Sequence, residues 1–234
     1  MSLSAADLLN AWEIGLQQPP LLRALTLLLA AQPDRSFEQL ARLSLGQRNR
    51  GLLDLREGLF GPRLESVAIC PQCGEQLTLD FATSDLFSTT APPPDTLQLE
   101  GDAGVITFRV PNTLDLIEAA KAGEVAAARE VLLQRCVNQP IDPLPDRAIE
   151  AITQAMAQAD PQADMQLALT CPACTHVWQM VFDIAAYLWA EINAWADRLL
   201  IDAHQLASAY GWREADILAM SAFRRERYLE MIGA

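Results

Sequence analysis

The sequence predicts a mainly α-helical fold that contains a small β zinc ribbon, and therefore an α+β protein. Three observations support this class. Apolar residues recur at intervals of three and four along most of the chain, as in amphipathic helices. Two Cys-Pro-X-Cys pairs are each flanked by alternating apolar and polar residues, which are typical of strands. One helical pattern near the carboxyl end runs from about Asp183 to Tyr210 and, at about 1.5 Å per residue, predicts a helix of roughly 40 Å.

Residues 1–63 predict an amino-terminal helical bundle. Ser4 caps the first helix, and Pro19-Pro20 ends it. The second helix, Leu21 to Ala31, is apolar on nearly all sides and is expected to be buried. Ser36 caps the third helix, and a fourth follows. Their apolar residues are Phe37, Leu40, Leu43 and Leu45 in the third, and Leu52, Leu53, Leu55 and Leu59 in the fourth.

The pattern around the cysteine pairs predicts an interrupted ribbon, whose two halves are residues 64–81 and 165–183. We expect residues 82–164 to form an insertion on its tip. The insertion begins with a Pro-rich linker and continues with a short hairpin and three helices. The linker spans residues 88–95, and the hairpin turns at Gly101 to Gly104. The first helix runs from Asn112 or Thr113 to Gly123, and the second from Val125 to Val137. Pro140, Pro143 and Pro145 follow the second helix, and the third runs from an Asp146 cap to Asp160.

Residues 184–234 predict the long helix and a C-terminal helical tip. Gly211 is expected to end the long helix, because glycine readily adopts the left-handed conformation found after helices. Two shorter helices, Glu214 to Met220 and Ser221 to Met231, complete the chain.

Composition and charge exclude several classes of protein. The 234 residues are 51% apolar and 20% charged, which excludes a low-complexity or collagen-like chain. Seventeen basic and thirty acidic side chains give a net charge of −13, which disfavours binding to the phosphate backbone of nucleic acids. No segment has the 18 or more apolar residues of a membrane helix, the longest run being Ala24 to Ala31. The amino end carries no secretory signal pattern, so we expect a cytoplasmic protein with reduced cysteines.

The four paired cysteines are candidate zinc ligands. Two-residue spacing lets both thiolates of a tight turn face one ion, and two such turns supply the four ligands of a closed tetrahedral site. The pairs lie 98 positions apart, and such a long interruption is tolerated because loop-closure entropy grows only slowly with length. Four thiolates leave no open coordination position, so we expect a structural Zn²⁺ without a catalytic role. The expected ligands are Cys70, Cys73, Cys171 and Cys174.

Three other interpretations of these cysteines stay open: disulfides, a thioredoxin-like redox pair, and knuckles that keep their turns without a metal. A reducing compartment disfavours disulfides. Strand-like flanks, in place of a helix within a βαβ unit, disfavour the redox pair. Gly74 suits the positive φ that often follows a knuckle, whereas Thr175 at the equivalent position weakens the match of the second knuckle.

No catalytic constellation is visible in the sequence. His176 lies two residues after Cys174 but is expected on a strand surface, because four cysteines already satisfy the ion. His204 and Glu191 lie on the predicted long helix without a pattern that indicates catalysis. Cys136 is expected to be a small buried apolar residue. We therefore predict neither an enzyme nor a small-molecule substrate.

Four segments after residue 65 share a further pattern. They are Phe108 to Leu116, Cys171 to Cys174 with Trp178, Asp183 to Trp195, and His204 to Leu229. Together these segments resemble the T4-type phage baseplate protein family, whose relatives are also encoded beside contractile injection systems, and the amino-terminal bundle matches only loosely. The resemblance implies a noncatalytic role in building or completing the baseplate or hub of a contractile tail. It also implies that the partners are other baseplate and hub proteins, and that the chain can become part of the assembled particle.

The C-terminal tip is the candidate partner-binding surface. From His204 onward four arginines balance four acids, so the net charge of −13 lies entirely before this segment. Arg, Trp and Tyr are enriched among interface hot spots. The candidate residues are Tyr210, Trp212, Arg224, Arg225 and Arg227. The alternative, that the aromatic residues complete the intramolecular core, stays open.

The main functional alternative is a zinc-ribbon protein of the transcription or translation apparatus. Basic side chains are then expected on the ribbon, but residues 64–81 and 165–183 contain no Lys or Arg. A third class, a metal-dependent hydrolase, would need an open coordination position and a general base near the zinc, and neither is apparent.

Overall fold

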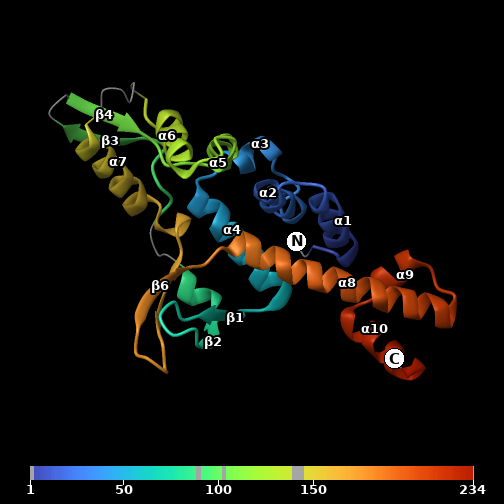
Figure 1. Ribbon diagram of the computed structural model, residues 1–234. Helices are drawn as coiled ribbons and strands as arrows, with labels where there is room; N and C mark the ends of the chain where they lie inside the picture. Colours follow the sequence, from blue (N-terminus) through green and yellow to red (C-terminus); the bar gives the residue numbers. More distant parts are fainter. Residues whose placement is uncertain (1–2, 88–90, 102–103, 139–144, 234) are drawn as a thin grey trace. The chain divides into compact units, whose positions relative to one another are not determined.

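The computed structural model describes residues 3–87, 91–101, 104–138 and 145–233 (Figure 1). Backbone contacts divide the chain into two compact units: unit 1 comprises Met1–Arg35 and Ala185–Ala234, and unit 2 comprises Ser36–Ile184. The division falls at Arg35, inside the segment 1–63 that we expected to form one bundle. The four-part organisation expected from the sequence stays a prediction.

Unit 1 consists of helices from the two ends of the chain. Ser4 caps the first helix as predicted, because its side chain accepts a hydrogen bond from the backbone amide of Asp7. Gly211 follows the long helix with φ of 68°, also as predicted. The helices are α1 (Ala5–Leu16), α2 (Pro20–Ala31), α8 (Ile184–Tyr210), α9 (Glu214–Leu218) and α10 (Ala222–Ile232), and only the first residue of α8 belongs to unit 2.

One face of α8 organises the core of unit 1. The indole Nε1 of Trp12 in α1 donates to Asn193 Oδ1 at 3.0 Å. A Cβ atom added at Gly15 would lie 2.4 Å from the ring of Trp189, so the close approach of α1 to α8 requires glycine there. The buried apolar residues of α8 repeat every three or four positions, which is the pattern that predicted the helix; they include Leu188, Ile192, Ala196, Leu199, Ala203 and Leu206.

Unit 2 begins with two helices, α3 (Phe37–Ala41) and α4 (Leu45–Phe60). The expected third helix, which was to include Leu43 and Leu45, was too long. Ser44 starts a new helix because its side chain accepts from the Gln47 amide while the Gln47 side chain accepts from the Ser44 amide. This reciprocal cap ends α3 early and positions α4.

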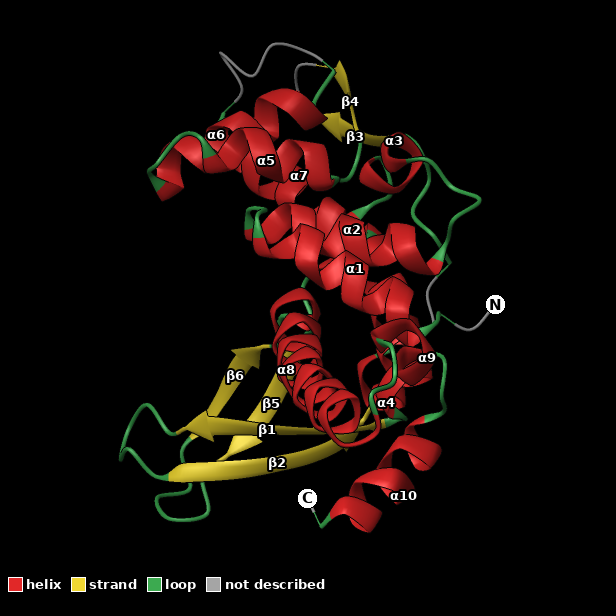
Figure 2. Ribbon diagram, turned by 90° about the vertical axis from the view of Figure 1, so that its right-hand side faces the viewer, coloured by secondary structure: helices red, strands yellow, loops and turns green. Residues whose placement is uncertain are grey.

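Two antiparallel hairpins in unit 2 carry the cysteine pairs, and they lie side by side in both ribbon views (Figures 1 and 2). The first is β1 (Arg63–Ile69) with β2 (Gln76–Ala82), and the second is β5 (Gln166–Thr170) with β6 (Val177–Val181). The ring of Phe81 meets the ring of Phe182 edge to face with centroids 5.5 Å apart, so an aromatic contact joins the two hairpins.

The segment between the hairpins has a core of its own. A third hairpin packs with two of the three helices around Ile106, Phe108, Leu133, Val137 and Ile152. The elements are the short 3₁₀ helix η1 (Thr83–Leu86), β3 (Leu97–Gly101), β4 (Gly104–Phe108), α5 (Thr113–Ala120), α6 (Val125–Cys136), α7 (Asp146–Ala159) and the 3₁₀ helix η2 (Pro161–Ala163). Asp146 is the first residue of α7, and Pro145 occupies the cap position that we expected Asp146 to take. Parts of the predicted linker (88–90), the predicted turn (102–103), and Pro140 and Pro143 lie outside the described residues.

Polar contacts attach this segment to α4. Asp160 Oδ2 accepts from the Gly46 amide at 2.9 Å, and Asn49 Nδ2 donates to the Gln162 carbonyl at 3.0 Å. A Cβ atom at Gly46 would lie 1.9 Å from Asp160 Oδ1, so the contact requires glycine. The end of the segment is therefore fixed against α4 immediately before the chain enters β5.

Candidate metal centre

The fold brings the four predicted cysteines into one cluster. Cys70 Sγ lies 3.7 Å from Cys174 Sγ, and Cys73 Sγ lies 3.6 Å from Cys171 Sγ. All four sulfur atoms lie within 4.8 Å of one another. Each close pair joins the two hairpins, so residues 98 and 104 positions apart in sequence face each other.

The two knuckles have the same backbone geometry. In the first, the Gly74 amide donates to the Cys70 carbonyl, and the Cys70 amide donates to the Glu75 carbonyl. In the second, Thr175 and His176 occupy the positions of Gly74 and Glu75, and the two corresponding hydrogen bonds to and from Cys171 are each 2.9 Å long.

The residue after each pair takes the left-handed conformation. Gly74 has φ of 78°, and Thr175 has φ of 61°, the single positive φ of a residue other than glycine in the described chain. A β-branched residue is strained in this region, and the surrounding structure must compensate for that strain. The mismatch at Thr175 noted from the sequence therefore does not prevent the second knuckle from adopting the geometry of the first.

The sulfur positions fit a tetrahedral metal site. Zn–S bonds of about 2.3 Å place the sulfur atoms of a regular tetrahedron about 3.8 Å apart. The two closest separations, 3.6 and 3.7 Å, are near this value. All five cysteines are free thiols, and a disulfide would need a sulfur separation of about 2.05 Å. Both pairs occupy hairpin turns, not the start of a helix where a thioredoxin-like redox pair sits.

The thiols of the cluster shift the pKa values of their neighbours in opposite directions. Burial opposes ionisation of Cys70, but backbone amides of its own turn and neighbouring thiols lower its pKa to about 7. The Glu75 amide favours the Cys73 thiolate, yet the surrounding thiols raise the pKa of Cys73 to about 12. Four thiolates within 4.8 Å of one another would repel, so full ionisation of the cluster would require a bound cation.

In each Cys-Pro-X-Cys pair the first cysteine is more deeply buried than the second. The first cysteine of each knuckle, Cys70 or Cys171, is 1% exposed, whereas Cys73 is exposed and Cys174 is half-buried. The cluster therefore has two candidate ligands on its protein side, Cys70 and Cys171, and two nearer the surface, Cys73 and Cys174. His176 does not join the cluster of ligand atoms, and its ring stacks on Trp178 with centroids 5.9 Å apart.

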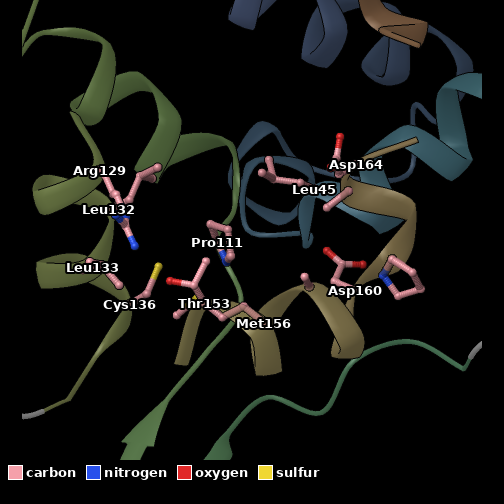
Figure 3. A pocket seen from close by; sticks show the side chains of 13 residues that line it. Leu45, Pro111, Arg129, Leu132, Leu133, Cys136, Thr153, Met156, Asp160 and Asp164 are labelled. Atoms are coloured by element: carbon pink, nitrogen blue, oxygen red, sulfur yellow. The ribbon is translucent and has the colours of Figure 1, made fainter. Parts of the chain in front are cut away.

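The other residues singled out in the sequence do not form a catalytic group. His204 is exposed on α8, and Glu191 is half-buried there. Cys136 is 1% exposed and lines an apolar pocket of about 450 Å³ among α4, α6, α7 and η2 (Figure 3). Burial raises the pKa of the Cys136 thiol to about 11, so this thiol is protonated at neutral pH, unlike a catalytic nucleophile.

Beside this pocket lies a buried charge network that the sequence analysis missed. Asp115, whose side chain is fully buried, accepts two hydrogen bonds from Arg109 at 2.6 and 3.0 Å and one from Arg135 Nε at 2.8 Å. The Asn112 amide also donates to it at 3.0 Å. Burial opposes ionisation of Asp115, but these donors hold its pKa below the usual value. Three of the four residues lie within the Phe108–Leu116 segment, and the capping pattern of Asn112 and Asp115 was the available signal.

The aromatic residues of the C-terminal tip form a cluster. The ring of Trp212 stacks on Tyr210 with centroids 4.4 Å apart and meets Tyr228 edge to face at 4.8 Å. Trp212 and Tyr228 are half-buried and pack against a core of Ala203, Leu206 and Ile217. The alternative that these aromatic residues complete the intramolecular core therefore holds for part of the Trp212 ring.

The arginines of the tip differ in exposure. Arg224 and Arg227 are exposed on α10. Arg225 is 6% exposed, and its Nη1 donates to the Met220 carbonyl at 2.6 Å. Our expectation that all the candidate partner-binding side chains are at least partly exposed is therefore wrong for Arg225, because this side chain folds back against its own unit.

Comparison with known protein families identifies the chain. Residues 20–189 match the family described as T4 bacteriophage base plate protein, and this match covers more than half of the sequence. The chain belongs to this family. The resemblance inferred from the sequence is thus confirmed. The match reaches further into the amino-terminal helices than we expected, and it ends before His204 to Leu229, one of the segments on which the resemblance was based. No curated protein and no solved structure matches the chain significantly.

The baseplate family match covers both cysteine pairs and the whole segment between them. The four-cysteine cluster, the Asp115 network and the first part of α8 therefore belong to the part of the chain that defines membership. Among the described residues, none of the helices combines the length and the apolar character needed to cross a bilayer.

Proposed function

We propose that this protein is a noncatalytic structural or assembly component of the baseplate or hub of a contractile phage tail, or of a related injection system, and that a structural Zn²⁺ stabilises it. Membership in the base plate family supports the assembly role. The observation that carries the zinc proposal is the cluster of four thiols whose closest separations match a ZnS₄ tetrahedron.

Cys70, Cys73, Cys171 and Cys174 would hold the ion and complete its coordination sphere. The ion would supply a covalent-strength connection between two hairpins that are distant in sequence, and no open position would remain for substrate or water. This connection would hold together the two ends of the intervening segment, residues 82–164. Its role would be to maintain one shape of unit 2 during assembly.

The partner surface that we propose is the tip of unit 1. Tyr210 is 37% exposed, and Arg224 and Arg227 are exposed on α10, so these side chains are available for contacts with other baseplate or hub proteins. Trp212 is half-buried and is available only in part, and Arg225 is removed from the set of direct surface contacts because it is buried.

Reversing the charge of Arg224 and Arg227 together to Glu is expected to weaken copurification with another baseplate protein of the same particle by about thirtyfold or more, as for loss of a hot spot. The melting temperature and zinc content should remain near those of the wild type, because both side chains are exposed. Pairwise binding of purified proteins measures the effect. The matched control reverses Arg129 and Arg147, which are exposed in unit 2. Equal binding by the two double variants would contradict the proposed surface.

Neither DNA nor RNA is expected to bind at physiological salt. The net charge of −13 repels a phosphate backbone, and the two ribbon halves carry no basic side chain between residues 64 and 81 or between 165 and 183. Titration of a labelled random oligonucleotide tests this prediction. Submicromolar affinity that decreases with added salt would instead favour a zinc-ribbon protein of the transcription or translation apparatus.

A further inference from the structure

Strand β6 has one backbone edge that faces β5 and another that meets no strand. In the part of the chain that the structure describes, β5 and β6 form a two-stranded sheet, and no third strand pairs with either. A strand at the edge of a sheet presents a row of backbone N–H and C=O groups that can pair with another chain. The hydrogen bonds at the two ends of the hairpin show which β6 residues point these groups away from β5.

These end bonds fix the alternation between them. The Cys171 amide donates to the His176 carbonyl at 2.9 Å, and the Phe182 amide donates to the Met165 carbonyl at 2.8 Å. Directly opposed residues of an antiparallel pair alternate between hydrogen-bonded and non-bonded pairs. The β6 residues that bond to β5 are therefore the even-numbered ones. The residues whose backbone groups point to the outer edge are Val177, Gln179 and Val181.

This outer edge lacks the features that usually protect an exposed strand, which are charged side chains, proline and β-bulges. Among the described residues, no backbone group outside the hairpin bonds to the three edge residues. The register of β5 and β6 is regular, and neither strand contains a charged residue or a proline. The other two hairpins of the described chain do carry charges on their strands, namely Arg63, Glu65 and Asp80 in the first and Glu100 in the other.

Both faces of β6 offer apolar side chains to an added strand. On one face Val177 is 66% exposed and Val181 is 64% exposed. On the other face Trp178 and Met180 are half-buried, whereas Leu169 of β5, directly opposite Trp178, is buried. At this pair β6 is thus less covered than β5. A strand beside β6 would cover Trp178 and Met180 and would pair its own side chains with the two valines.

We propose that the outer edge of β6 binds an extended segment of another baseplate protein, which adds a strand to the hairpin. The backbone pattern identifies the occupant, because an extended chain matches the alternating donors and acceptors of a strand edge. The side chains of β6 favour an uncharged segment with apolar residues on both faces, since a charge beside them would lose contact with water. Two copies of this chain, each with a net charge of −13, repel one another, which favours a different protein as the source. That this protein belongs to the baseplate rests on the proposed function.

Amide hydrogen exchange of the free protein tests the edge without a partner. The amides of Val177, Gln179 and Val181 are expected to have protection factors at least about tenfold lower than those of Trp178 and Met180, which donate to β5. Equal protection of the two sets would overturn the proposal, because the edge would then be occupied within the chain. Sedimentation at several concentrations accompanies this measurement. A dimer in which the edge amides become protected would also overturn the proposal and would assign the edge to a second copy.

Pairwise binding to the other baseplate proteins of the particle tests the occupant. Gln179→Pro removes an edge N–H without removing a hydrogen bond to β5, and it should weaken binding about tenfold or more. The matched control is Ala168→Pro, which removes an outward N–H from β5 at the residue opposite Gln179. This control should bind like the wild type.

A second pair of variants leaves the backbone intact and serves if proline disturbs the fold. Val181→Lys places a charge on the β6 edge, and Gln166→Lys places one on the directly opposed residue of β5. Binding should fall about tenfold or more for Val181→Lys and remain unchanged for Gln166→Lys.

The outcomes separate this proposal from the proposed function. In the complex, the amides of Val177, Gln179 and Val181 should gain protection of about tenfold or more. If the wild type binds a partner but Val181→Lys binds it equally well, or the edge amides stay unprotected, the strand proposal fails and the proposed function stands. If the wild type binds none of the baseplate proteins, the proposed function fails and the strand proposal fails with it.

Discussion

Cys171→Ser is expected to abolish metal binding and to unfold much of unit 2. The free energy of binding at a structural zinc site is folding free energy, about 10–16 kcal/mol in zinc-finger peptides. The total stability of a typical domain is about 5–15 kcal/mol, so losing even part of the zinc contribution exceeds what a domain of ordinary stability tolerates. Elemental analysis should give one zinc per wild-type chain and none for the variant. Circular dichroism should show a large decrease in melting temperature.

Cys136 offers a matched control for this prediction. It is as buried as Cys171 but lies outside the four-thiol cluster, so Cys136→Ser should retain one zinc per chain. Less than half an equivalent of zinc in wild-type protein purified without chelator would contradict the zinc proposal. Full zinc content in Cys171→Ser would contradict the assignment of this ligand.

Asp115→Ala is expected to lower the free energy of unfolding by about 3–5 kcal/mol, the range found when one partner of a buried ion pair is removed. The carboxylate is fully buried and joins Arg109 on the strand side to Arg135 at the end of α6. Without it the two guanidinium groups, which are 33% and 38% exposed, would lose their buried counter-charge and keep only partial contact with solvent. Chemical denaturation at neutral pH measures the loss. Glu118→Ala on the same helix removes an exposed pair with Lys121 and should cost less than about 1 kcal/mol.

The Asp115 contribution should also depend on pH with a defined sign. Its pKa in the folded protein is lowered from 3.8, because the surrounding donors outweigh burial. A group whose pKa is lower in the folded than in the unfolded protein stabilises the fold fully when the pH is above its unfolded-state pKa. This stabilisation is lost as the pH falls through the folded-state pKa. The stabilities of the wild type and Asp115→Ala should therefore differ most above about pH 5 and approach each other in acid. A difference that grows as the pH falls below 4 would contradict the assigned direction.

Local signals account for what the sequence predicted well. The N-caps at Ser4, Ser36 and Asn112, the end of α8 at Gly211 and the strands beside each cysteine pair all depend on residues within a few positions of one another. Such patterns are visible in the sequence because a helix cap or a hairpin turn satisfies its own backbone hydrogen bonds. The four metal-ligand candidates were also identifiable, since only two cysteine pairs have the spacing of a knuckle.

Errors arose where two local signals competed. A continuous apolar pattern led us to extend the third helix to Leu45, although Ser44 and Gln47 contain the reciprocal cap that starts α4. Thr175 is the opposite case. Its intrinsic preference opposes a positive φ, but the hydrogen bonds of the second knuckle impose that conformation.

By itself, the sequence determined the helical and hairpin elements, the two knuckles and the family resemblance. Tertiary structure alone decided which distant residues meet: Cys70 with Cys174, Gly46 with Asp160, and Arg109 and Arg135 on one buried carboxylate. It also decided that Arg225 is buried while Arg224, its neighbour in sequence, is exposed. The physical reason is that burial and ion pairing depend on which helix face another element covers. That choice is made by packing between segments up to 181 residues apart, and no short window of sequence contains it.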